Sequence, residues 1–290
     1  HCFVTQYQLD GAKGIRDPRN MYGMLLKADL HVVTVDQRKL MNLANTVSRC
    51  HLDIAEFIVS PHAAGLGCLE ADEQELGVTL IDMGAAETSV AIFTGGANIY
   101  NFVIPMGGQH VTKDLAQGLS TGLVHAERLK TLHGSVLASA NDEQSMVHVP
   151  LIGEEDSRDE TTVPRAQLVT IIRPRVEEIF ELIYEHLEDH QMMQSMGQHV
   201  VLTGGASQLV GVRELATSLF GKQVRIGKPK SFAGLAESVS STGFSAAVGM
   251  LHYAKSRPFE ESLLNHTTRS HHVSVGNGMK KLVSWLKERF

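Results

Sequence analysis

Residues 77–108 read GVTLIDMGAAETSVAIFTGGANIYNFVIPMGG, and this stretch decides the fold. It contains three short runs rich in apolar and β-branched residues, at 78–81, 89–93 and 99–104. Small residues separate the runs, first Gly84-Ala85-Ala86 and then Gly95-Gly96, and a Gly-Gly pair between apolar runs is a hairpin signal. The pattern predicts three strands joined by two tight turns.

The first turn begins at Asp82, which ends the first strand-like run. A carboxylate in that position can reach a cation or its water, while the backbone N–H groups of a small-residue turn face a phosphate. The stretch therefore indicates a site for metal-bound phosphate. An ordinary hairpin with an aspartate in its turn fits these residues equally well.

The overall composition is that of a globular protein. Of the 290 residues 43% are hydrophobic, and the mean hydropathy is -0.05, which suits one large or two medium domains. The 26 basic and 32 acidic residues give a net charge of -6, which argues against nucleic acid as a partner. The three cysteines lack metal-type spacing and the 15 histidines are scattered, so we expect a reducing compartment and no metal-ion site in the protein itself.

Apolar periodicity and turn signals predict the other elements. In the first part they predict strands at 3–9 and 24–35, a helix capped by Asp36 and reaching Cys50, a strand at 54–59, and a helix opened by Pro61 and reaching Gln74. In the second part they predict helices at 111–119, 123–133, 166–190, 210–220 and 245–253, and strands at 146–151, 200–202 and 223–226. Pro174 should start or kink the long helix, because proline lacks an amide hydrogen and clashes with the preceding turn.

Two further motifs suggest a ligand. Thr203-Gly204-Gly205-Ala206 follows a buried strand, and glycine there lets the backbone approach a ligand where any Cβ would clash. A plain strand–turn–helix connection is about as good an interpretation. Glu127 and Lys130 lie three residues apart on one helix face, for which a surface ion pair is the simpler interpretation.

The end of the chain carries a separate signal. After a polar stretch at 256–278, typical of a flexible linker, apolar residues recur at helical spacing beside Trp285: Met279, Leu282, Val283, Leu286 and Phe290. This face is flanked by four bases, Lys280, Lys281, Lys287 and Arg289. A basic amphipathic helix with a tryptophan is typical of a membrane interface. Packing back onto the chain's own domain is the alternative.

The order of these motifs resembles the FtsA family, the actin-like cell division proteins of bacteria. The similar blocks are IDMG with TGG, PMGGQHVTKDLAQGL, AERLKTLHG, IIRPRVEEIFELI, VVLTGGASQLVG, VRIGKP, SAAVGMLHY and KKLVSWLKERF. The resemblance implies an α/β, actin-like ATPase fold of the ribonuclease H-like type, with a C-terminal amphipathic helix. The family's first phosphate loop has no counterpart here, so we expect a fold that is incomplete at the N-terminus.

The resemblance also implies a division of the chain. The expected parts are 1–35 as a remnant of the FtsA-specific subdomain, 36–76 as part of actin-like domain 1, 77–241 as domain 2 with an inserted subdomain at 116–198, 242–255 as a helix returning to domain 1, 256–278 as a linker and 279–290 as a membrane-targeting helix.

The resemblance implies a site for ATP with Mg²⁺ in the complete protein, and we expect weak or no nucleotide binding by these 290 residues alone. The residues of the site would be Asp82, Gly84, Thr88, Gly107, Gly108, Glu127, Lys130, Thr203, Gly204, Gly205 and Ala206. The phosphate turn departs from the family pattern, because Ala85 and Ala86 replace glycines, Glu87 replaces threonine and Ser89 replaces a second aspartate. Methyl groups narrow the approach to phosphate, and Glu87 adds a negative charge beside an anion. We therefore expect no catalytic residue, at most weak ATPase activity, and nucleotide binding that is mainly structural.

Partners follow from the same resemblance. Arg175 and Glu178 match positions that receive the C-terminal tail of FtsZ, although charges there usually form only a solvated helix face. Residues 279–290 would bind the anionic cytoplasmic face of the inner membrane. The implied function is to tether FtsZ filaments to the membrane at the division site, polymerising with ATP and contacting other division proteins. The alternatives are an actin-like pilus-assembly protein resembling PilM, and an ATPase or sugar kinase of the same superfamily.

Overall fold

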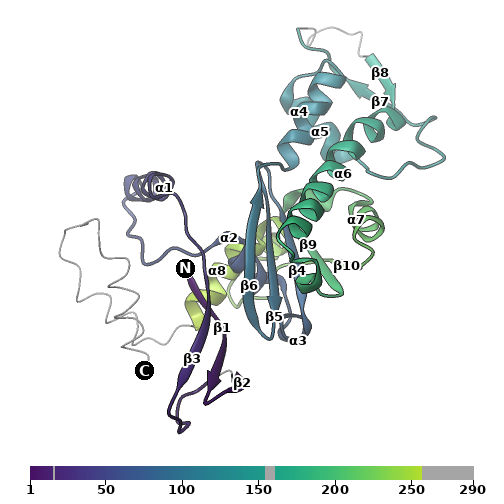
Figure 1. The fold of residues 1–290 in the computed structure, drawn as a ribbon. Helices are drawn as coiled ribbons and strands as arrows, with labels where there is room; N and C mark the ends of the chain where they lie inside the picture. The colour runs from purple at the N-terminus through teal and green to yellow at the C-terminus, as the bar shows by residue number, and fades with distance from the viewer. Residues whose placement is uncertain (16, 154–160, 257–290) are drawn as a thin grey trace.

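The structure is a computed structural model that describes residues 1–15, 17–153 and 161–256. A five-stranded mixed sheet lies at its centre (Figure 1), in the order β10-β9-β4-β5-β6. The strands are β4 (Val78–Met83), β5 (Thr88–Thr94), β6 (Ala97–Ile104), β9 (His199–Thr203) and β10 (Gln223–Ile226). β4 pairs antiparallel with β5 and parallel with β9. The predicted hairpin therefore forms, and a strand from much later in the chain extends it.

Both faces of the central sheet are covered, which explains why its strands read as continuous apolar runs. Ile81 and Val90 point into a larger core shared with α4 (Gly108–Gly118), α5 (Leu123–His133), α6 (Arg165–Asp189) and α7 (Val212–Phe220). Leu80 and Ala91 point into a smaller core on the opposite face. Successive side chains of a strand alternate between its two faces, so one strand serves both cores.

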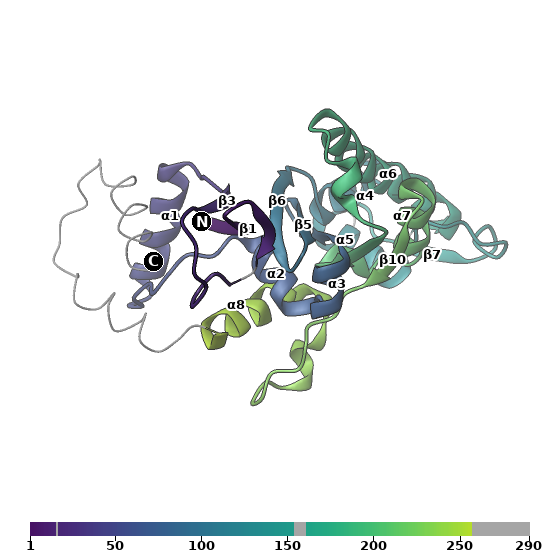
Figure 2. The same cartoon turned by 60° about the horizontal axis from the view of Figure 1, so that its bottom comes forward.

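Helices α2 (Ser60–Cys68) and α8 (Ser245–Ser256) pack against each other on the smaller-core side of the sheet, and both lie below it in the view of Figure 2. A Cβ built on Gly249 would lie 1.7 Å from the carbonyl oxygen of Ala63, and one built on Gly67 would lie 2.1 Å from that of Ser245. Only glycine fits at either position, so the two backbones are in direct contact.

The predicted helix reaching Gln74 is wrong in its extent. After α2 the chain extends at Leu69 and Glu70 and starts a separate helix, α3 (Ala71–Leu76). A capping box explains the new start, because the side chain of Glu70 accepts from the backbone of Glu73 while the side chain of Glu73 accepts from the N–H of Glu70 at 2.8 Å.

An inserted part projects from the end of the central sheet (Figure 1), and it consists of α4, α5, the hairpin of β7 (Met146–Val149) and β8 (Thr161–Pro164), and the start of α6. Sequence reasoning did not predict β8. Of the two outcomes expected at Pro174, a helix start is wrong, since α6 begins at Arg165 and contains Pro174 in its interior, while a kink there stays a prediction. The buried residues Ile172 and Val176 flank the proline, and such burial offsets the roughly 3 kcal/mol that an internal proline costs.

The N-terminal part is a separate three-stranded sheet, in the order β2 (Ala12–Ile15), β1 (Cys2–Leu9) and β3 (Leu26–Val32). It contacts the central sheet at β6, where a ring nitrogen of His31 lies 3.2 Å from the carbonyl oxygen of Asn98. Helix α1 (Gln37–Arg49) follows with Asp36 as its N-cap, as predicted, and none of its residues is buried.

The strand predicted at 54–59 does not form. The segment has no regular secondary structure and leads directly into α2 at Ser60. The described helices also include none long and apolar enough to cross a membrane. The predicted amphipathic helix at 279–290, and the predicted linker apart from Ser256, lie outside the described residues.

Candidate functional site

The turn after β4 is held against the start of α4. Inside the turn, the N–H of Gly84 donates to the carbonyl oxygen of Glu87 at 3.0 Å. The N–H of Gly108 donates in turn to the carbonyl oxygen of Gly84 at 2.9 Å. A Cβ built on Gly107 would lie 2.6 Å from that same oxygen, so no larger residue fits between the turn and the helix. Within the described residues, no acceptor pairs with the N–H groups of Ala85 and Ala86.

The second glycine motif follows β9, which lies beside β4. Thr203 is in register with Asp82 across the parallel pair. A Cβ built on Gly204 would lie 2.4 Å from the carbonyl oxygen of Met83 and 2.5 Å from Oδ1 of Asp82. Gly205 differs, because a Cβ built there meets nothing within 4 Å. Gly204 is therefore packed against the end of β4, while Gly205 faces open space.

Glu127 and Lys130 form part of a network that joins α5 to α4, not an isolated surface pair. Nζ of Lys130 donates to Oε2 of Glu127 at 2.7 Å, to Oγ1 of Thr112 at 2.9 Å and to the carbonyl oxygen of Gly108 at 3.0 Å. The ammonium group has three protons, so these acceptors satisfy it. Burial alone would raise the pKa of Glu127, but the hydrogen bonds from Lys130 and Thr112 lower it overall, and the carboxylate stays ionised.

The three groups of residues meet at Gly108. A Cβ built on Gly108 would lie 3.2 Å from Cβ of Ala206, 3.5 Å from Nζ of Lys130 and 3.6 Å from the carbonyl oxygen of Gly84. Residues far apart in the sequence thus surround one point, at the N-terminal end of α4. A helix N-terminus carries partial positive charge and favours an anion.

Asp82 lies near the end of β4, two residues before Gly84. Burial raises its pKa to about 6, and the nearby carboxylate of Glu87 adds to the effect. A cation would reverse this by stabilising the ionised form. Thr88 is placed differently from the prediction, because its buried hydroxyl donates to the carbonyl oxygen of Met106 at 2.7 Å and supports the connection to α4.

A hollow of about 710 Å³ borders this region. It is lined by residues of the connection from β9 to α7 and by the segment 237–242, and includes Ser207, Lys228 and Thr242. Neither Asp82 nor Lys130 lines it, so it adjoins the converging motifs without enclosing them.

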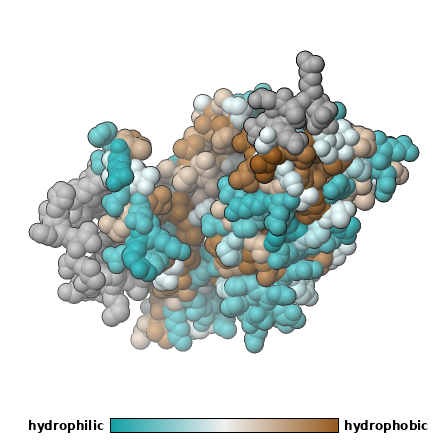
Figure 3. Space-filling model, turned by 90° about the horizontal axis from the view of Figure 1, so that it is seen from above, coloured by the Kyte–Doolittle hydropathy of each residue, from teal (hydrophilic) through white to brown (hydrophobic). Residues whose placement is uncertain are grey.

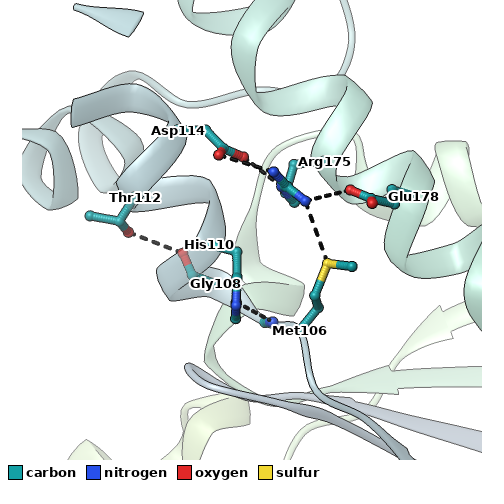
Figure 4. A network of polar contacts seen from close by, with 8 residues as sticks. Met106, Gly108, His110, Thr112, Asp114, Arg175 and Glu178 are labelled. Atoms are coloured by element: carbon teal, nitrogen blue, oxygen red, sulfur yellow. Dashed lines mark hydrogen bonds and ion pairs between the residues drawn. The ribbon is translucent and has the colours of Figure 1, made fainter. Parts of the chain in front are cut away.

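The predicted partner-binding pair, Arg175 and Glu178, lies elsewhere, in a polar network between α6 and α4 (Figure 4). Arg175 binds Asp114 with two hydrogen bonds, of 2.6 and 3.1 Å, and Glu178 with one of 2.5 Å. The Arg175 and Asp114 side chains are 28% and 27% exposed. Arg175 therefore joins two helices, and is not a free surface charge.

Several residues of these sites were not found from the sequence. Thr112 and Asp114 lie on α4 as ordinary polar residues of an amphipathic helix, and only the fold shows that they face α5 and α6. Ser245 was also missed, although its hydroxyl shares a hydrogen bond of 2.6 Å with that of Thr203. Their partners lie far away along the chain, so no local sequence signal marks them.

Comparison with protein families decides the chain's relationship. The family model described as cell division protein FtsA matches residues 79–249, and the model described as the SHS2 domain inserted in FTSA matches residues 1–34. The chain belongs to the FtsA family of cell division proteins. The family resemblance inferred from the motifs is thereby confirmed.

FtsA relatives match along the whole chain. FtsA of Agrobacterium fabrum (strain C58 / ATCC 33970) is 43% identical over 294 residues, which cover 100% of this chain and 66% of the relative. FtsA of Escherichia coli (strain K12) is 34% identical over 300 residues, covering 100% of this chain and 70% of the relative. The chain thus spans about two thirds of the length of these FtsA proteins.

Solved structures show the fold. MreB5 of Spiroplasma citri bound to ADP superposes with a TM-score of 0.61 at 17% identity, covering 81% of this chain and 69% of that chain. The PilM–PilN type IV pilus biogenesis complex gives a TM-score of 0.56 at 20% identity, covering 77% of this chain and 59% of that chain. The predicted α/β actin-like fold is confirmed for this member of the FtsA family.

Proposed function

We propose that the converging motifs form one side of a site for ATP with Mg²⁺. The observation that carries this proposal is the meeting of the phosphate turn, Lys130 and Ala206 around Gly108. The unpaired N–H groups of Ala85 and Ala86 would face phosphate oxygens, and Asp82 would reach the cation or its water. Gly205 has open space before it and would let the nucleotide approach the backbone.

Glu127 would bind the adenosine part through a ribose hydroxyl. Its side chain is 52% exposed, and Lys130 and Thr112 both engage the same oxygen, Oε2. The other oxygen is therefore available as an acceptor. Lys130 orients this carboxylate and does not bind phosphate itself, because its three protons are already used.

We propose that hydrolysis is slow and that nucleotide binding serves assembly. Efficient phosphoryl transfer depends on positioning and on stabilising charge on the transferred group. Glu87 places a negative charge at the turn, and the methyl groups of Ala85 and Ala86 narrow the approach. ATP turnover at rates typical of kinases, roughly 1–100 per second, would contradict this proposal.

A test of the nucleotide site compares Glu127→Ala with Glu127→Gln. The alanine variant should bind Mg-ATP roughly 10- to 150-fold more weakly, since one charge-assisted hydrogen bond to the ligand contributes roughly 1.5–3 kcal/mol. The glutamine variant keeps an acceptor and should lose less. Titration calorimetry measures both, and equal affinity in the parent and in Glu127→Ala would remove the assignment.

For the role in cell division, we propose that the protein tethers FtsZ filaments to the cytoplasmic face of the inner membrane through residues 279–290. Membership of the FtsA family and the basic, amphipathic sequence of this segment support the proposal. One segment would hold marginally, because several kcal/mol of association entropy oppose its burial in lipid. Many linked copies would hold firmly, since each detached segment rebinds at high local concentration. Deleting residues 279–290 should abolish sedimentation with anionic liposomes, and unchanged sedimentation would contradict the tether.

Self-assembly is supported by exposed apolar residues at two separate places. Tyr22 and Met24 of the N-terminal part are 102% and 98% exposed, while Val124, on the inserted part, is 80% exposed. Figure 3, which looks down on the inserted part, shows an apolar area there. Contacts between two different surfaces of identical chains build open filaments.

The FtsZ-tail contact needs a test that allows for the internal role of Arg175. If the tail binds Arg175 directly, Arg175→Ala should weaken binding of a tail peptide, whereas Asp114→Ala frees the guanidinium and should preserve or strengthen it. If the pair matters only for the packing of α6 on α4, both substitutions should weaken binding alike. That second result, measured by fluorescence anisotropy, would remove the assignment.

A further inference from the structure

A groove lies between α6 and α7, apart from the sites described above. It has a volume of about 250 Å³ and is lined by Phe180, Glu181, Tyr184, Glu185 and Leu219. Figures 1 and 2 both show α7 lying against α6. None of the lining residues belongs to the converging glycine motifs or to the Arg175 network.

The groove has an apolar floor and an acidic rim. Phe180 is fully buried, while Tyr184 and Leu219 are 39% and 37% exposed. Glu181 and Glu185 are both exposed and lie four residues apart on α6, where like charges destabilise a helix. Among the described residues, no base pairs with either carboxylate. A basic partner would relieve this repulsion.

The size of the groove indicates what kind of partner fits. Pockets for drug-sized ligands enclose about 300–1,000 Å³, more than is available here. A groove that accepts a few apolar side chains suits an amphipathic helix, which binds through residues spaced by three or four positions. The occupant should therefore be apolar on one face and basic beside it.

We propose that residues 279–290 of this same chain dock in the α6–α7 groove, with apolar residues against Tyr184 and Leu219 and basic residues against Glu181 and Glu185. The segment has the required spacing of apolar residues and carries four bases. The stretch 257–278, if extended, reaches about 75 Å. A compact chain of this length has a radius of gyration of about 19 Å, so the segment can reach the groove from the end of α8.

Docking would make the segment's two binding modes exclusive. The apolar face that enters the groove is the face that would enter lipid, so a docked segment is withheld from the membrane. Only this competition rests on the function proposed above, because docking itself needs no lipid. If about 80% of the segments are docked, the apparent affinity for vesicles falls about fivefold.

Trp285 gives a direct readout, because it is the only tryptophan in the chain. In the absence of lipid, its emission in the full 290-residue chain should be blue-shifted and protected from acrylamide quenching, relative to a peptide of residues 279–290. Glu181→Lys/Glu185→Lys should abolish both effects. The control Asp53→Lys/Glu143→Lys makes the same change in net charge at exposed positions outside α6 and should preserve them.

Tyr184→Ala provides a second test that leaves the charge unchanged, and should also reduce the protection of Trp285. Far-ultraviolet circular dichroism checks that each variant is folded. Emission of Trp285 that matches the free peptide, or that is the same in the parent and both groove variants, would overturn the docking proposal.

Vesicles of phosphatidylglycerol and phosphatidylcholine test the competition. Glu181→Lys/Glu185→Lys should reach half-maximal binding at about fivefold lower lipid concentration than the charge-matched control. If the groove variant and the charge-matched control reached half-maximal binding at the same lipid concentration, the proposed competition would be overturned. If no variant bound vesicles, the membrane tether would fail, while Trp285 emission without lipid would still decide the docking.

Discussion

Gly204 should be irreplaceable for stability, whereas its neighbour Gly205 should matter only for the ligand. Gly204 has φ 85° and ψ 166°, a conformation that essentially only glycine adopts. Forcing alanine into it costs about 1–3 kcal/mol. The new Cβ would also lie 2.4 Å from the carbonyl oxygen of Met83, which is backbone and can move only together with β4.

That steric conflict adds to the conformational cost. Overpacking a close contact typically costs about 1–3 kcal/mol, so Gly204→Ala should lower the free energy of unfolding by about 2–6 kcal/mol in all. Gly205 has no positive φ, and its Cβ would meet nothing within 4 Å. Gly205→Ala should therefore stay within about 0.5 kcal/mol of the parent.

Urea unfolding without nucleotide, followed by circular dichroism, measures both variants, and titration with Mg-ATP follows for Gly205→Ala. We expect the latter to be as stable as the parent but weaker in nucleotide binding, because its methyl group occupies the open space before the turn. Gly204→Ala within 1 kcal/mol of the parent would show that the turn and β9 are less tightly apposed than the structure has them.

Three further predictions concern stability. Asp82 has a pKa of about 6 in the folded protein and an ordinary value of 3.8, so the folded state holds the proton more tightly and stability falls as pH rises from about 4 to 6. The free energy of unfolding of Asp82→Asn should equal that of the parent at pH 4 and exceed it by about 3 kcal/mol at pH 7. Urea unfolding without Mg²⁺ measures both. Arg175→Ala and Asp114→Ala should each cost about 1–3 kcal/mol, and the double variant less than their sum, because each single change leaves a partly buried partner unpaired. Additive costs would argue against the bridge. Gly249→Ala should cost about 3–5 kcal/mol, measured as a lower melting temperature, since its Cβ would overlap the backbone of α2.

The central hairpin could be predicted from the sequence because its signals are local. The apolar runs and the two small-residue turns specify β4, β5 and β6 without reference to the rest of the chain. Helix α1 was similarly predictable from its Asp36 cap, whose side chain accepts from the N–H of Arg38 at 2.8 Å. Predictions were wrong where tertiary packing decides, as for the helix start expected at Pro174, which the core around α6 accommodates, and for the strand expected at 54–59.

The candidate site was predictable in its glycines but not in its polar partners. Glycines that allow close approach stand out in the sequence, and the structure brings Gly84 against Gly107 and Gly108, and Gly204 against the end of β4. Thr88 was predicted to belong to the nucleotide site. Its buried hydroxyl instead donates a hydrogen bond to the backbone carbonyl oxygen of Met106, because a buried hydroxyl bonds to a nearby backbone acceptor. Arg175 read as a surface charge, since its partner Asp114 lies 61 positions away along the chain.

The contact between α2 and α8 has a mechanical consequence. A force on the chain beyond Ser256 would pull on α8. Because Gly249 and Gly67 hold the backbones of α8 and α2 in direct contact, α2 would move with it. The load would also reach Thr203 at the end of β9, beside the proposed nucleotide site, because Ser245, the first residue of α8, shares a hydrogen bond with it. Tension on the end of the chain and a ligand at the proposed site would therefore be coupled through the single helix α8.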